Sequence, residues 1–287
     1  MKEKIKFGVS TWLWTSPFNS DTVELFPKLR EMGFDYVEIP VEDPEIIDAE
    51  IVKEALIENK LKPIICGAFG SSRDLTSTDI SIHENCFQYL EACFKLSQSL
   101  DAGFVAGPMY SAVGKARLLH PEERKAEWNL AVKNLRKVCE MAEKYNQKIA
   151  LEPLNRFESD LVNTAEQVLN LVQDINHPSA KVMLDSFHMT LEERNLQQAI
   201  ELVGDQLIHF QVSENYRGAP GTGQTRWDDI KKGIENIDYS GAISIESFTP
   251  HVQELAGAVC IWRSFHPSQD KFATDGLSFL KSLFNSN

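Results

Sequence analysis

The sequence predicts an α/β fold, a single (β/α)8 TIM-barrel domain over residues 1–287. Eight short apolar runs recur along the chain, and amphipathic stretches separate them. The runs are mostly unbroken rather than alternating, as is typical of parallel strands buried on both faces. The length of 287 residues also suits one such barrel, which typically uses about 250 residues. The predicted strands are 5–11, 34–40, 61–67, 102–108, 148–153, 181–186, 207–213 and 241–247.

The intervening stretches predict helices. The stretch from Pro121, for example, opens with proline and acidic residues, a favoured helix start. Strands that alternate with helices in this way favour a parallel barrel. An open doubly wound sheet is the alternative, but its first turn would carry a glycine fingerprint, and here that turn reads STWLWTSPF. The predicted helices are 21–32, 47–60, 81–100, 121–145, 164–175, 191–203, 227–236 and 251–283, the last interrupted near Pro267.

The charge balance narrows the class of partner. With 29 basic and 42 acidic residues the net charge is −13, which argues against nucleic acid or an anionic membrane. No stretch approaches 18 consecutive apolar residues, and MKEKIKFGVST lacks the apolar core of a secretory signal. The five cysteines form no C-x-x-C pair. We therefore expect a cytoplasmic protein with a small-molecule ligand, neutral, cationic or reached through a bound cation.

Four predicted strands end in an oxygen-bearing side chain. They are Glu152 in KIALEPLNRFE, Asp185 in AKVMLDSFHM, Gln211 in LIHFQVSEN and Glu246 in GAISIESF, spaced 33, 26 and 35 residues apart. A single glutamate after a strand is more often a loop residue. Three acids at corresponding strand ends of one barrel instead converge on its mouth, where such enzymes keep their chemistry. Buried together, they need a divalent cation between them, with Gln211 as fourth ligand.

The other four strand ends predict walls and hydrogen bonds around a small ligand. They carry Trp14, Glu38, Cys66 and Gly107. His209 lies two residues before Gln211 on the same strand face, and we interpret it as a core histidine bonded to a neighbour. Four aromatic residues offer apolar faces to a sugar ring or chain, namely Trp12, Trp14, Phe157 and Phe248.

These motifs resemble those of a known family. LEPLNRFE, MLDSFHM, SENYRGAPGTG and the strand ending in Glu246 are similar to the D-tagatose/D-psicose (allulose) 3-epimerase branch of the xylose isomerase-like TIM barrels, the sugar phosphate isomerase/epimerase group. The similarity runs through nearly the whole chain. It implies that Glu152, Asp185 and Glu246 bind Mn²⁺, Co²⁺ or Mg²⁺ together with a histidine, and that the two glutamates move the C3 proton.

The resemblance also assigns substrate contacts and assembly. It implies that Glu158, His188 and Arg217 hold the oxygens at C1–C3 of a ketose. Members of this branch are commonly dimers or tetramers, so we expect a homodimer or homotetramer. The family's fourth ligand, a histidine, falls on Gln211 here. The harder amide oxygen of glutamine favours Mn²⁺ or Mg²⁺, with Co²⁺ less favoured.

Three functions are therefore open. The leading hypothesis is metal-dependent epimerisation of a free, non-phosphorylated ketose at C3 through a cis-enediolate, with Glu152 and Glu246 as acid and base. The alternative is a lyase or dehydratase of the same superfamily acting on a keto-sugar or 3-keto-glycoside, because some relatives with glutamine at this position eliminate or dehydrate. A non-catalytic sugar-binding barrel is the third, and it would be expected to lose one of the two acids. A phosphorylated substrate is disfavoured because the loops after strands seven and eight offer only Arg217 and Arg226.

Overall fold

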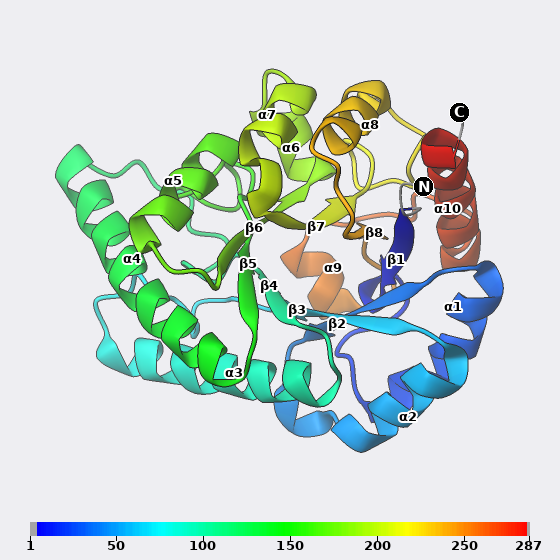
Figure 1. Cartoon of the computed structure of the whole chain (residues 1–287), viewed down its shortest axis with the longest axis horizontal. Coiled ribbons are helices and arrows are strands. Elements are labelled where there is room, and N and C mark those ends of the chain that lie inside the picture. Colours follow the sequence, from blue (N-terminus) through cyan, green and yellow to red (C-terminus); the bar gives the residue numbers. More distant parts are fainter. Residues whose placement is uncertain (1–4, 286–287) are drawn as a thin grey trace.

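A computed structural model describes residues 5–285 and confirms the predicted barrel. Eight parallel strands close in chain order, β1 beside β8, and helices surround them as an outer ring (Figure 1). The strands are β1 Lys6–Ser10, β2 Tyr36–Val41, β3 Lys62–Gly67, β4 Phe104–Gly107, β5 Lys148–Leu151, β6 Ala180–Asp185, β7 Leu207–Val212 and β8 Ala242–Ile245. Each strand overlaps a predicted apolar run and extends at most one residue beyond it.

The helices follow the predicted order, with two differences. The α-helices are α1 Phe26–Met32, α2 Ala49–Asn59, α3 Ile80–Ser99, α4 Pro121–Lys144, α5 Ala165–Ile175, α6 Ser186–Glu192, α7 Leu196–Val203, α8 Trp227–Asn236, α9 Gln253–Ala258 and α10 Gln269–Asn285. The predicted helix 21–32 begins as a 3-10 segment, Ser20–Leu25, and becomes α-helical only at Phe26, with Pro27 in its first turn. The predicted helix 191–203 is two helices, because α6 starts directly after Asp185 and Asn195 caps a new helix, α7.

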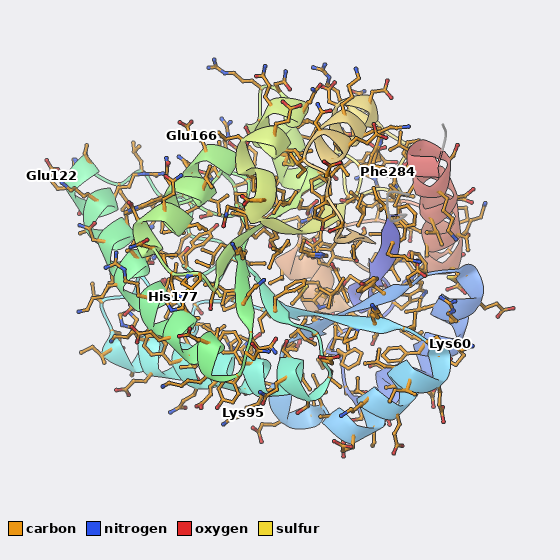
Figure 2. The ribbon with its side chains drawn as sticks, in the orientation of Figure 1. Lys60, Lys95, Glu122, Glu166, His177 and Phe284 are labelled. Carbon is orange, nitrogen blue, oxygen red and sulfur yellow. The ribbon has the colours of Figure 1, made fainter. Side chains whose placement is uncertain are left out.

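The apolar core has two parts. The larger cluster fills the space between the strands and the ring of helices. A smaller one, inside the barrel, includes Ile64, Ala106, Ala150 and Met183. Charged side chains such as Lys95, Glu122 and Glu166 project outward from their helices (Figure 2). None of the helices among residues 5–285 combines the length and the hydropathy that a membrane-spanning helix requires.

Strand register brings the predicted ligand positions to one end of the barrel. Asp185 pairs with Gln211, and Val212 pairs with Ile245, the residue before Glu246. Helix α9 lies across the same end (Figure 1), and its Leu255 lines the cavity there. The site is therefore built on rigid strand ends beneath a helical cover.

Candidate active site

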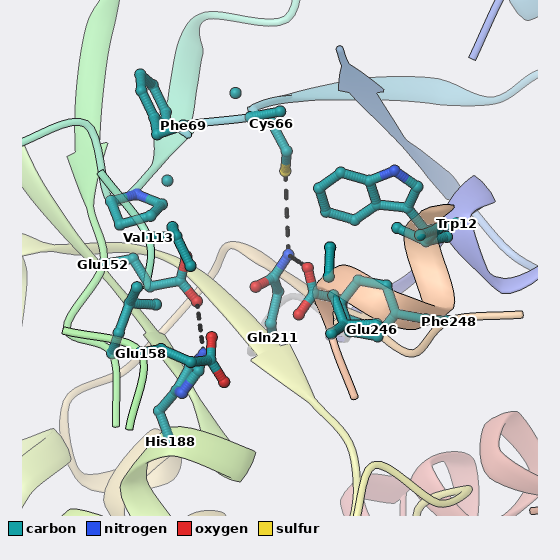
Figure 3. A pocket seen from close by; sticks show the side chains of 18 of the residues that line it. Trp12, Cys66, Phe69, Val113, Glu152, Glu158, His188, Gln211, Glu246 and Phe248 are labelled. Carbon is teal, nitrogen blue, oxygen red and sulfur yellow. Dashed lines mark hydrogen bonds and ion pairs between the residues drawn. The ribbon is translucent and has the colours of Figure 1, made fainter. Parts of the chain in front are cut away.

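A cavity of about 320 Å³ opens at the carboxyl ends of the strands. Its inner wall is polar, and it includes Glu152, Glu158, His188, Gln211, Arg217 and Glu246. Its outer walls are largely apolar, and they include Trp12, Phe69, Val113, Phe248, Leu255 and Val259 (Figure 3). A small ligand with polar groups at one end matches this division.

The structure brings the four predicted strand-end residues together. Glu152 and Glu246 follow the last residues of β5 and β8, Asp185 ends β6 and Gln211 lies near the end of β7. All four are buried, with Glu152 and Glu246 only 7% and 6% exposed. The Gln211 Nε2 atom donates to Oε1 of Glu246 at 3.1 Å. In Figure 3, Gln211 lies between Glu152 on one side of the cavity and Glu246 on the other.

Arg217 joins two of these acids. Its Nη1 atom donates to Asp185 Oδ2 at 2.5 Å and to Glu246 Oε2 at 2.8 Å. The guanidinium carbon lies 4.1 Å from the ring centroid of Phe187 and 5.2 Å from that of Phe248, so two aromatic rings contact the cation. Its backbone is left-handed, with φ of 62°, an unusual conformation for a residue other than glycine. The carboxylates of Asp185 and Glu246 therefore both point toward the Nη1 atom of Arg217.

Acid outnumbers base in this site. Five carboxyl groups lie in or directly beneath the cavity with one arginine, Arg217; they belong to Glu38, Glu152, Glu158, Asp185 and Glu246. Burial, and then repulsion from Glu246 and Asp185, raises the pKa of Glu152 well above its usual value. Burial also raises the pKa of Glu246, although Arg217 opposes the shift. A divalent cation would relieve this excess of negative charge.

The donor atoms fit a hard divalent cation. Single ligand atoms of Glu152, Asp185 and His188 lie within 4.8 Å of one another. The Oε1 atom of Gln211 is buried and has no hydrogen-bond partner among residues 5–285. An unpaired amide oxygen beside three carboxylates is a suitable ligand for Mn²⁺ or Mg²⁺. The predicted ligand set of Glu152, Asp185, Gln211 and Glu246 shares Glu152 and Asp185 with this group and otherwise stays a prediction.

His188 is better placed as a donor than as a ligand. The backbone N–H of Asn155 donates to its Nδ1 atom at 3.0 Å, so the neutral ring carries its proton on Nε2. Burial, and then Arg217, lowers the pKa of His188 to about 4, which keeps the ring neutral at pH 7. Its Nε2 atom faces Glu152 Oε1 at 3.6 Å. In this tautomer Nε2 donates to a ligand oxygen, whereas a metal would bind Nε2 only in the other tautomer, in which Nε2 would also accept from Nη2 of Arg217 at 3.3 Å.

Three other predicted residues line the cavity. Glu158 follows β5 and accepts a hydrogen bond from the Asn155 side chain at 2.7 Å. Cys66 lies in β3, and burial, followed by nearby carboxylates, raises the pKa of its thiol so that it stays protonated. Gly107 ends β4 with φ of 133°, and a Cβ atom there would lie 3.1 Å from the Gly67 carbonyl oxygen. Only glycine fits that position without strain.

The expectation that Trp14 lines the cavity is wrong. Its Nε1 atom donates to Asp270 at 2.7 Å, away from the cavity, because the strand β1 ends at Ser10 and a 3-10 turn follows. Trp12 lines the cavity instead and packs against Phe248. Phe157 is likewise outside the lining and is 72% exposed. Of the four aromatic residues, Trp12 and Phe248 therefore line the cavity, and Trp14 and Phe157 do not.

Two polar residues of the site were not singled out from the sequence, although Asn155 lies within LEPLNRFE. Asn155 contacts both His188 and Glu158, and Glu42 accepts a hydrogen bond from Trp12 Nε1 at 2.6 Å. Glu42 directly follows β2 and lines the cavity, so the rule that found Glu152 and Glu246 at their strand ends could have found it, whereas Asn155 lies in a loop. The interpretation of His209 as a bonded core histidine is confirmed, because its Nε2 atom lies 2.6 Å from Glu38 Oε1.

Comparison with known proteins places this site in a family. A sequence profile described as "Xylose isomerase-like TIM barrel" matches residues 26–283. The chain belongs to the xylose isomerase-like TIM barrel family. This confirms the family resemblance drawn from the motifs.

Three named proteins are similar to this chain over nearly its whole length. A "Probable ketose 3-epimerase" from Synechocystis sp. is 31% identical, over 99% of this chain and 98% of its own. An "L-ribulose 3-epimerase" from Methylomonas sp. is 27% identical over 98% and 99%. A crystal structure of D-allulose 3-epimerase from Methylomonas sp. in complex with D-allulose superposes with a TM-score of 0.91, at 26% identity and 98% coverage of both chains. The prediction of an isomerase-class enzyme agrees with these names.

Proposed function

We propose that the protein is a divalent-cation-dependent ketose 3-epimerase that acts on free ketoses. The carrying observation is that two buried glutamates, Glu152 and Glu246, stand on opposite sides of one cavity with the Gln211 amide between them (Figure 3). Inversion at a carbon that bears an acidic proton needs a base on one face and an acid on the other. This pair supplies both.

The cation would be held by Glu152, Asp185, Glu246 and the free amide oxygen of Gln211. When bound, it supplies Lewis-acid polarisation of the substrate carbonyl and so makes the neighbouring C3 proton more acidic. Mn²⁺ and Mg²⁺ match this all-oxygen donor set, and Co²⁺ matches it less well.

The chain's own residues then carry the proton. One glutamate removes the C3 proton from one face of the ketose, which leaves a cis-enediolate. The other glutamate returns a proton to the opposite face. Burial raises the pKa values of Glu152 and Glu246 in the absence of a cation, and a bound cation would oppose this shift and favour the carboxylate form that removes the C3 proton.

Hydrogen-bond donors hold the substrate oxygens. His188 Nε2 and Arg217 Nη2 lie 3.3 Å apart, and because both are N–H donors in this tautomer, they would donate to one substrate oxygen rather than bond to each other. Glu158 accepts from a hydroxyl group on the same wall. Oriented donors of this kind stabilise the negative charge that develops on the enediolate oxygens.

The cavity favours a free sugar over a phosphorylated one. Among the described residues, Arg217 is the only arginine or lysine in the lining, and its Nη1 atom is occupied by Asp185 and Glu246. A phosphate group would add two negative charges beside an acidic cluster. The far wall, with Trp12 and Phe248, offers apolar surface instead.

Product analysis tests this function. Purified protein with Mn²⁺ is incubated with D-fructose, D-tagatose, D-allulose and L-ribulose, and the C3 epimers are separated by chromatography. We expect at least one C3 epimer pair to interconvert, and we expect chelator to stop the reaction. The Glu246→Gln and Glu152→Gln variants should each abolish it while the thermal unfolding midpoint stays close to that of the parent.

Other products would redirect the assignment. A 3-keto-glycoside substrate that yields elimination products, with no epimer from any ketose, would place the protein among the lyases. Sugar binding by calorimetry without turnover would indicate a binding protein. Sedimentation of the purified protein tests the homodimer or homotetramer that we propose from the family.

A further inference from the structure

We propose that Glu38, a buried residue of β2, is a positioning residue that orients the Gln211 amide so that its oxygen is presented to the cation. This inference rests on the proposed function, because it concerns a ligand of the proposed metal site. Glu38 does not line the cavity, and its side chain is fully buried within the barrel. It therefore acts through Gln211 rather than on the substrate.

The two ends of the Gln211 amide have different surroundings. Its Nε2 atom lies 3.0 Å from Glu38 Oε2 and 3.1 Å from Glu246 Oε1, so each amide hydrogen has a carboxylate acceptor. Its Oε1 atom has no partner among the described residues. In Figure 3 the nitrogen points toward Cys66 and Glu246, and the oxygen toward the side of Glu152.

The opposite orientation of the amide is unfavourable. Rotation by 180° would place the amide oxygen against two carboxylate oxygens, and it would point the NH₂ group at the proposed cation. Glutamine needs this constraint because its amide can turn either the oxygen or the NH₂ group toward the cation. An imidazole at this position has no such choice between an oxygen and an NH₂ group. Glu246 is itself a proposed ligand and proton carrier. Glu38 is the acceptor that stays in place throughout.

A second residue of β7 fixes Glu38. His209 Nε2 lies 2.6 Å from Glu38 Oε1, and the Glu38 carboxylate therefore bridges the two inward-facing side chains His209 and Gln211. Both side chains are buried. Outer hydrogen bonds of this type typically change metal affinity by about 10–100-fold when removed.

Mn²⁺ binding, measured by electron paramagnetic resonance of the free ion, tests the inference without turnover. The variants are Glu38→Gln, Gln211→Ala and the double variant. We expect Glu38→Gln to weaken Mn²⁺ binding about 10–100-fold, because its amide lets Gln211 turn over. We expect Gln211→Ala to weaken binding as well, and the double variant to bind no more weakly than Gln211→Ala alone.

A matched control separates this effect from general loss of a buried acid. Glu214 is also fully buried, and it accepts hydrogen bonds from Gly221, Thr225 and Trp227 without touching a proposed ligand. Glu214→Gln should leave Mn²⁺ affinity within twofold of the parent. Should Glu38→Gln fail to fold, Glu38→Asp keeps the charge, withdraws the acceptor by one methylene and is expected to weaken Mn²⁺ binding in the same cycle.

The outcomes are distinct from those of the proposed function. Parent protein that binds Mn²⁺, with Glu38→Gln binding equally well or with fully additive losses in the double variant, would overturn the role of Glu38 alone. Parent protein that does not bind millimolar Mn²⁺ would overturn both. Coupled losses of Mn²⁺ affinity without epimerisation of any ketose would support Glu38 and overturn the epimerase.

Discussion

The Nη1 atom of Arg217 lies 2.8 Å from Oε2 of Glu246, and it also donates to Asp185. The guanidinium thus neutralises two of the acids that the proposed cation needs. Arg217→Met should tighten Mn²⁺ binding about tenfold or more, because a competing positive charge is removed. The same change should lower kcat/KM about 10²–10³-fold through loss of an oriented donor. Calorimetric titration and steady-state kinetics measure the two effects, and weaker Mn²⁺ binding would contradict this account of the charge balance.

Asn155 sets the protonation of His188 in our account. Its side-chain Nδ2 atom lies 2.9 Å from His188 Nδ1. Asn155→Asp places a carboxylate there, which should raise the pKa of His188 above its value of about 4 and move proton density to Nδ1. We expect kcat/KM to fall about 10–100-fold, with ¹⁵N NMR of the ring reporting the new protonation state. Asn155→Ala keeps the backbone donor and is the control that should retain the Nε2–H tautomer.

Glu42 holds the Trp12 wall. Its Oε1 atom accepts from Trp12 Nε1 at 2.6 Å and from Ser16 Oγ at 2.7 Å. Glu42→Ala should leave the Trp12 side chain less firmly held. We expect KM to rise about five- to tenfold, which corresponds to about 1 kcal/mol of lost substrate binding free energy, with kcat nearly unchanged. Trp12→Phe, which keeps an aromatic ring opposite Phe248, should change KM less. An equal fall in kcat for Glu42→Ala would mean that Glu42 acts in the transition state.

Asp74 makes stability depend on pH. Burial alone would raise its pKa, but hydrogen bonds from Thr76 and Lys115 outweigh burial and lower the pKa below its usual value. A carboxyl group with a lowered folded-state pKa stabilises the fold above its unfolded-state pKa, near 4, and loses that contribution as pH falls further. Asp74→Asn should therefore lower the free energy of unfolding by about 1–3 kcal/mol at pH 7. Denaturant titrations should show the gap to the parent closing below pH 4, and a gap that persists there would rule out an electrostatic cause.

The barrel was predictable because parallel strands that are buried on both faces have unbroken apolar sequences. The acids of the site follow directly after these apolar runs. Glu152, Asp185 and Glu246 needed only that rule to be placed together. Trp14 was misplaced because a 3-10 turn after β1 directs Trp12, not Trp14, to the cavity. The hydrogen bonds that Asn155 donates, and those that Glu42 accepts from Trp12 and Ser16, depend on loop conformation, which apolar periodicity does not encode.

The sequence predicts the position of Gln211 but not the orientation of its amide. Its position predicted a ligand-type oxygen, but only the structure shows that Glu38 and Glu246 take both amide hydrogens and leave Oε1 unpaired. The orientation of an amide is set by its neighbours in space, and Glu38 lies 173 residues away in the chain.

Proton exchange at C3 tests the central claim most directly. Metal-loaded protein is incubated in D₂O with a ketose that it converts, and the C3 position is followed by NMR. We predict deuterium at C3 in the epimer, none at C4 or C5, and loss of the C3 signal from both sugars as equilibrium is approached. An epimer that keeps its original proton at C3 throughout would contradict proton transfer through Glu152 and Glu246.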